Sequence, residues 1–167
     1  LGTVGILLPI ISIVRKEQGS NSFYAVIAFA ALIVSMGYVG YQFLSENVAP
    51  AALFSEDVIV DDAFGGLFAI AMLIVALFTT VGSFNYMRKH NSPAVYYSLI
   101  LLATIGMVLV AYSTDLVMLF VAWELMSIPT YVLVGFMKKN PSSNEAALKY
   151  FLFGALSSAI IVYGISI

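Results

Sequence analysis

Cysteine is absent from this 167-residue sequence, and histidine occurs once, as His90. Without thiols the chain can form neither a disulfide nor a thiolate-ligated iron–sulfur cluster, and a single histidine argues against haem ligation. We therefore expect no metal site and no cofactor-binding site in this chain. Any redox chemistry associated with it would have to take place in other chains.

Charged side chains are also scarce: they make up 10% of the residues, against 62% hydrophobic residues. With a mean hydropathy of +1.02, the sequence is too apolar for a soluble domain of this length. The apolar residues form long blocks instead of alternating with polar ones, which indicates helices and argues against an outer-membrane barrel. The sequence therefore predicts an all-α, polytopic transmembrane helix bundle.

Six apolar segments can be drawn along the chain, and the first of them is too short to span a bilayer. They run over about 1–14, 23–44, 63–86, 94–113, 116–137 and from 144 to the last residue. Short connections after the third, fourth and fifth segments make consecutive helices antiparallel neighbours. Because the chain starts at Leu1 and stops at Ile167 inside an apolar run, we expect it to be part of a longer protein.

The basic residues between the segments are confined to one side of the predicted membrane. All the basic ones follow odd-numbered segments: Arg15, Lys16, Arg88, Lys89, Lys138 and Lys139. The opposite connections carry only acidic residues, namely Glu46, Glu56, Asp57, Asp61, Asp62 and Asp115. Cytoplasmic loops collect lysine and arginine, so the pattern predicts a multi-pass protein of the cell membrane. Its amino-terminal end would face outside, and its basic loops would be cytoplasmic.

Glu124 lies inside the apolar segment Leu116–Met137. Eight helical residues place its carboxyl group about 12 Å below one surface of a hydrocarbon core about 30 Å thick. A lone ionisable group at that depth costs several kcal/mol unless water or a partner reaches it, so it indicates a functional site. The alternative is that Glu124 is a structural hydrogen-bonding group beside a packing kink.

Three further residues of the same segment support a site at Glu124. Pro129 removes one backbone donor and is expected to bend the helix. Ser127 and Tyr131 follow Glu124 by three and seven residues, which puts them on the same helical face. A carboxyl group, two hydroxyl groups and a freed carbonyl on one face can hold a short chain of water.

Lys149 is a second ionisable group in an apolar segment, about 8 Å below the basic surface if its helix begins near Asn144. Glu145 precedes it by one turn, so the two side chains could simply neutralise each other. An axial offset of about 12 Å on antiparallel helices excludes direct contact between Glu124 and Lys149. Buried ionisable groups change their proton occupancy when a charged neighbour approaches or leaves, so we predict that both residues translocate protons.

Small residues recur along the segments at spacings typical of helix contacts. These are Gly2 and Gly5, Gly37 and Gly40, and Gly154 with Ser158. Side chains of this size let membrane helices approach closely. We expect these positions to lie at helix–helix interfaces.

Two stretches, WELMSIPTYVLVGF (123–136) and EAALKYFLFGALSSAIIVYGISI (145–167), resemble the antiporter-like membrane subunits of respiratory complex I, specifically the group called subunit N. VDDAFGGLF (60–68) and the SFNY turn (83–86) fit that family more loosely. The family includes related deazaflavin- or ferredoxin-linked dehydrogenases. The resemblance implies a subunit of about fourteen helices with two inverted half-channels, of which this chain is the amino-terminal part. In the family, the glutamate at the position of Glu124 pairs with a lysine on a broken seventh helix, and a further lysine corresponds to Lys149.

The resemblance also implies a domain division and a function. Residues 1–114 would form the first four helices, and residues 115–167 the fifth and sixth, where the first proton half-channel starts. The chain would translocate protons for a translocase of the NADH:quinone oxidoreductase type, or its deazaflavin-linked equivalent, without holding a redox centre itself. NADH or reduced deazaflavin, flavin, iron–sulfur clusters and quinone would be bound by other subunits.

The expected partners are the other membrane-arm subunits and the lipid bilayer, with no nucleic acid. Two other functions stay open. One is that of a subunit of a multi-subunit sodium/proton antiporter, which would exchange ions without electron flow. The other is that of a structural membrane-arm subunit that transports nothing, for which changes at Glu124 and Lys149 would be neutral.

Overall fold

Helices form nearly all of the chain that the structure, a computed structural model, describes: residues 1–14, 21–45, 58–59, 62–87 and 92–167. They are α1 (Gly2–Val14), α2 (Asn21–Ser45), α3 (Ala63–Gly82), α4 (Phe84–Met87), α5 (Pro93–Tyr112), α6 (Leu116–Val134) and α7 (Pro141–Ile165). Within these residues the only β-type pairing is an isolated bridge between Ile59 and Ser113. The predicted all-α fold is confirmed.

Each of the six predicted segments corresponds to a helix, with one interruption. The third segment was expected to run unbroken to residue 86, but α3 ends at Gly82 and the short α4 follows. At this break both the amide and the hydroxyl group of Ser83 donate to the carbonyl of Thr79. Five helices, α2, α3, α5, α6 and α7, are long and apolar enough to cross a membrane, whereas α1 has 13 residues. The chain is a multi-pass membrane protein.

Helix α5 lies at the centre of the bundle and packs against α1, α2, α3 and α6. Its fully buried side chains include Tyr97, Leu101 and Thr104. Polar groups of α5 bond to backbone carbonyls: Thr104 Oγ1 donates to Ile100, and Ser98 Oγ donates to Gly5 of α1. These bonds satisfy polar groups inside an apolar bundle.

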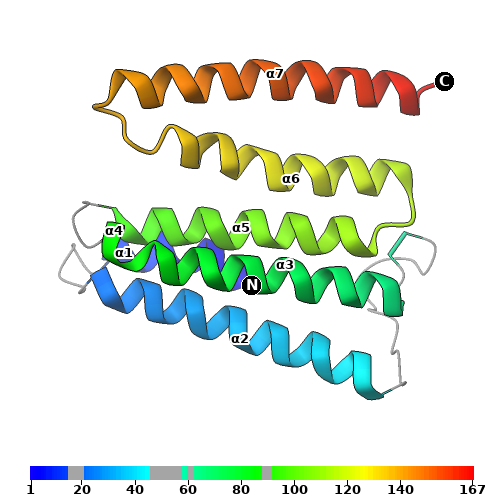
Figure 1. Ribbon diagram of the computed structural model, residues 1–167, viewed down its shortest axis with the longest axis horizontal. Helices are drawn as coiled ribbons and strands as arrows, with labels where there is room; N and C mark the ends of the chain where they lie inside the picture. Colours follow the sequence, from blue (N-terminus) through cyan, green and yellow to red (C-terminus); the bar gives the residue numbers. More distant parts are fainter. Residues whose placement is uncertain (15–20, 46–57, 60–61, 88–91) are drawn as a thin grey trace.

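Helices α6 and α7 extend the bundle outward from α5 as two further layers (Figure 1). Helix α7 packs against α6 and contains no buried residue. Helix α7 is thus the outermost layer of the described bundle on this side.

Glycines are not all at interfaces, contrary to the prediction. Gly2 and Gly5 of α1 lie against α5, where a Cβ atom would be 3.6 Å from Ile105 and 3.5 Å from Leu101. By contrast, a Cβ atom at Gly37 or Gly40 of α2 would have nothing within 4 Å among the described residues. The predicted close contact at these two positions is wrong.

The helix ends fall into two groups that follow the charge pattern. α1, α4 and α6 end, and α2, α5 and α7 begin, at the same end of the bundle (Figure 1). Lys138 and Lys139 are exposed at this end, while the other four basic loop residues lie outside the described part of the chain. Asp62 and Asp115 lie at the opposite end, where α3 and α6 begin.

Both of these aspartates cap a helix. The carboxylate of Asp62 accepts a hydrogen bond of 2.7 Å from the amide of Gly65. The carboxylate of Asp115 accepts bonds of 2.9 and 3.0 Å from the amides of Val117 and Met118. Such bonds satisfy donors that the first turn of a helix leaves free.

Replacing the Asp115 cap should destabilise α6 measurably. We expect Asp115→Ala to lower the free energy of unfolding by about 1 kcal/mol, because two amide donors lose their acceptor. Asp115→Asn should retain most of the stability, since the amide oxygen can accept the same bonds. Unfolding of the purified chain at increasing SDS content, followed by circular dichroism, measures both. Equal losses for the two variants would show that the charge matters and not the cap.

Candidate functional site

Glu124 lies on α6, eight residues after the helix begins, and therefore about 12 Å along its axis. The residue is half-buried, and its Oε1 atom accepts a hydrogen bond from the hydroxyl group of Ser158 on α7. The bond joins two membrane-spanning helices within their apolar stretch. Sequence reasoning noted Ser158 only as a small packing residue and missed this contact.

Tyr131 fixes the register between α6 and α7. Its ring meets Tyr150 and Phe151 edge-on, at centroid distances of 5.0 and 5.7 Å. It also covers Gly154, where a Cβ atom would be only 2.6 Å from the ring carbon that carries the hydroxyl group. Glu124 and Tyr131 therefore both face α7, which confirms the prediction that they share a helical face.

Ser127 uses its hydroxyl group within α6. It is 7% exposed and donates to the carbonyl of Trp123 at 2.8 Å. Thr130 donates in turn to the carbonyl of Ser127 at 2.7 Å. Pro129, also buried, lacks the amide that would normally bond to Leu125. The two hydroxyl bonds support the backbone on either side of this gap, so Ser127 and Pro129 shape the helix beside Glu124.

Lys149 pairs with Glu145 on α7, with 2.5 Å between Nζ and Oε1. Both side chains are 66% exposed. Glu145 precedes Gly154 by nine residues, or two and a half helical turns, so it points away from α6. The structure thus contains the Glu145–Lys149 pair that the sequence spacing suggested.

The position of Lys149 along its helix differs from the prediction. Helix α7 begins at Pro141 instead of near Asn144, which places Lys149 about 12 Å from the helix start and not 8 Å. Ser158, at the level of Glu124, follows Lys149 by nine residues, or about 14 Å. The predicted lack of direct contact between Glu124 and Lys149 is confirmed, since each has another partner.

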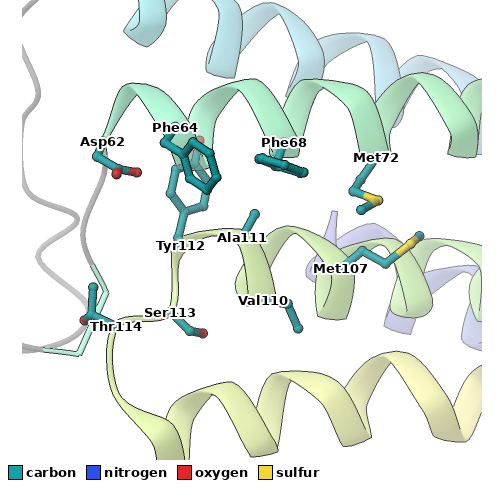
Figure 2. Close-up of a pocket in the computed structure, with 10 residues that line it drawn as sticks. All are labelled: Asp62, Phe64, Phe68, Met72, Met107, Val110, Ala111, Tyr112, Ser113 and Thr114. Carbon is teal, nitrogen blue, oxygen red and sulfur yellow. The ribbon is translucent and has the colours of Figure 1, made fainter.

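A separate groove of about 380 Å³ lies between α3 and α5 near their acidic ends (Figure 2). Phe64, Phe68, Met72 and Met107 form most of its apolar wall. Asp62 is the one carboxylate among the residues that line it, and that carboxylate caps α3. Among the described residues, no three His, Asp or Glu side chains lie close enough to hold a metal ion.

Comparisons with known proteins agree on one family. A family model described as "NADH:quinone oxidoreductase/Mrp antiporter, TM" matches residues 113–167. The chain is 35% identical to NADH-quinone oxidoreductase subunit N of Desulfitobacterium hafniense, covering 100% of this chain and 32% of that protein. It is 32% identical to F(420)H(2) dehydrogenase subunit N of Methanosarcina mazei, covering 99% of this chain and 34% of that protein. A structure of respiratory complex I from Thermus thermophilus with bound Aureothin matches with a TM-score of 0.75 and 25% identity, over 98% of this chain and 34% of that one.

The helix bundle and the similarity along nearly all of this chain point to one class: the chain is similar to the antiporter-like membrane subunits of the complex I family. Within that family it is similar to subunit N of both the NADH-linked and the F420H2-linked complexes, as its sequence motifs predicted. The chain spans about a third of the length of the curated relatives it matches.

Proposed function

We propose that this chain translocates protons as a membrane subunit of a redox-driven complex I-type reductase of quinone or a quinone-like carrier. The observation that carries the proposal is the half-buried carboxyl group of Glu124, held inside the membrane-spanning α6 by a hydrogen bond from Ser158. An ionisable group at this depth is costly, and proton transfer is a common reason for its presence.

The proton route would pass through the interface between α6 and α7 at Glu124 and Tyr131. Nearer the basic end it would continue to Lys149, which lies on the face of α7 turned away from α6. Ser127 and Pro129 shape the helix next to Glu124, and Glu145 is the ion partner that Lys149 gains or loses. In this proposal, residues 115–167 start the first half-channel, and residues 1–114 form the four preceding helices.

The exposed Glu145–Lys149 pair supports the presence of partner subunits. A charged pair left in lipid costs free energy, so we infer that water or other protein covers this face of α7 in the assembled complex. The partners would be the other membrane-arm subunits, within the lipid bilayer of the cell membrane. NADH or reduced deazaflavin, flavin, iron–sulfur clusters and quinone would be bound by those subunits. The basic end of the bundle would face the cytoplasm and the amino-terminal end the outside.

Two neighbouring serines provide a test with a matched control. We expect Ser158→Ala to slow proton translocation by about tenfold, because the carboxyl group of Glu124 loses a hydrogen bond inside an apolar bundle. Ser157→Ala should have no effect, since Ser157 is exposed and its hydroxyl group bonds to Phe153 of its own helix at 2.9 Å. Proton uptake by inverted membrane vesicles, divided by the rate of donor oxidation, is the measurement. Equal rates for the two variants would contradict the proposed route.

A sodium/proton antiporter subunit is the second candidate, because the matching family model also covers Mrp antiporters. Vesicles that contain the chain distinguish the two functions. An antiporter would exchange sodium for protons with no electron donor present, whereas a subunit of a redox-driven pump would need electron flow. A structural role without transport would leave Glu124 and Lys149 variants unimpaired.

A further inference from the structure

A groove at the basic end of the bundle lies where α5 begins and α6 ends. It measures about 920 Å³. Val95 of α5 and Val132 of α6 contribute apolar wall, and Lys138 and Lys139 of the following connection contribute two cationic groups. The groove therefore has an apolar side within the membrane and a cationic rim at the level of the helix ends.

The connection that carries the two lysines is held in place by hydrogen bonds. The amide of Asn140 donates to the carbonyl of Met137 at 2.8 Å. The side chain of Asn144 donates to the carbonyl of Lys138 at 3.0 Å, and Ser143 Oγ donates to Val134 at 2.7 Å. The backbone at the rim is thus ordered before any ligand arrives, which lowers the entropic cost of binding.

The two lysine side chains are exposed and available to a ligand. Among the described residues neither forms an ion pair, and the nearest acid on α7, Glu145, is paired with Lys149. Helix α7 also begins at this groove, so the positive end of its dipole adds to the cationic rim. The rim therefore attracts an anion.

The apolar wall decides which anion fits. Val95 is 42% exposed and Val132 is 48% exposed, and both lie in helices long enough to span the membrane. A soluble phosphate would leave this wall uncovered, whereas a phospholipid would place its phosphate at the lysines and an acyl chain along the valines. The smaller groove at the opposite end has Asp62 at its rim, which would repel an anionic headgroup (Figure 2).

We propose that the groove bounded by Val95, Val132 and Lys138–Lys139 is a binding site for an anionic phospholipid. Basic pockets between membrane helices bind anionic headgroups in this way. The lipid would seal the junction of α5, α6 and α7 on the basic side of the bundle. This site is distinct from the interface that holds Glu124, and the proposal does not depend on proton translocation.

Native mass spectrometry of the delipidated full chain tests the site, with dioleoyl phosphatidylglycerol as the probe and dioleoyl phosphatidylcholine for comparison. We expect the double variant Lys138→Gln/Lys139→Gln to weaken phosphatidylglycerol binding about tenfold, because each lysine near an anionic lipid contributes to affinity. The double variant Arg15→Gln/Lys16→Gln removes the same charge from another basic connection and should bind as the unchanged chain does.

Each other outcome would overturn the proposal. Equal loss in both double variants would point to a general surface potential, and equal binding of both lipids would show that the headgroup charge is irrelevant. Competition by glycerol phosphate at the same concentration would identify a soluble anion as the ligand. Phosphatidylglycerol with a photoreactive acyl chain gives an independent measurement: labelling should centre on peptides containing Val95 and Val132, and uniform labelling of all helices would contradict the site.

Discussion

Glu124→Gln is expected to lower proton translocation at least about a hundredfold while the chain remains assembled in the membrane. The glutamine side chain has the same shape, and its oxygen can still accept the hydrogen bond from Ser158. It cannot take up and release a proton, however. Packing between α6 and α7 should therefore survive while proton transfer stops. The measurement is proton uptake by inverted vesicles per donor oxidised, with the amount of chain determined on immunoblots.

A double variant separates the role of Ser158 from other effects. If Ser158 acts only through the carboxyl group, adding Ser158→Ala to Glu124→Gln should cause no further loss of translocation. A further tenfold loss would show that Ser158 acts elsewhere in the route. Unchanged translocation in Glu124→Gln would remove Glu124 from the route and would favour a structural role for the chain.

The helices were largely predictable because each lies in a block of apolar residues. The start of α6 at Leu116 was predicted correctly, since Asp115 is a charged residue directly before such a block and caps the helix. The start of α7 was missed by three residues. The polar stretch from Pro141 looks like a loop by hydropathy, but Asn140 caps the helix, and a proline is well tolerated in the first turn.

The candidate site was predictable in part. Glu124 stands out because a carboxyl group is rare inside an apolar helix. Ser158 does not, because a serine in a membrane helix is compatible with packing alone. The contact of Ser158 with Glu124 depends on the register of α6 against α7, which is set by the ring of Tyr131 packing on Gly154. For Lys149, the sequence spacing suggested Glu145 as a partner, but only the arrangement of the helices shows that both side chains face away from α6.

Glycine contacts could not be predicted from the sequence either, because glycines at an interface and glycines on an open surface can have the same spacing. Gly37 and Gly40 have the spacing of an interface but lie on an open surface of α2. Gly106 of α5 was not singled out, yet a Cβ atom there would be 2.7 Å from the Cα atom and 2.8 Å from the Cβ atom of Met126 on α6. The central crossing of α5 and α6 therefore requires a glycine.

Gly106→Ala is expected to destabilise the bundle strongly. The added methyl group meets the backbone of Met126, which cannot rotate away as a flexible side chain can, so the two helices must separate. We expect a loss of about 3 kcal/mol, at the upper end of the range for overpacking. The measurement is the unfolding of the purified chain at increasing SDS content.

Gly37→Ala is the matched control, because the same methyl group added to α2 meets no atom within 4 Å among the described residues. It should leave the free energy of unfolding unchanged or raise it by up to about 1 kcal/mol, since alanine is the better helix former. Opposite signs for the two variants would confirm the tight crossing of α5 and α6. Similar small shifts would mean that the helices cross further apart, and Glu124, two residues before Met126, would then be held less firmly against Ser158.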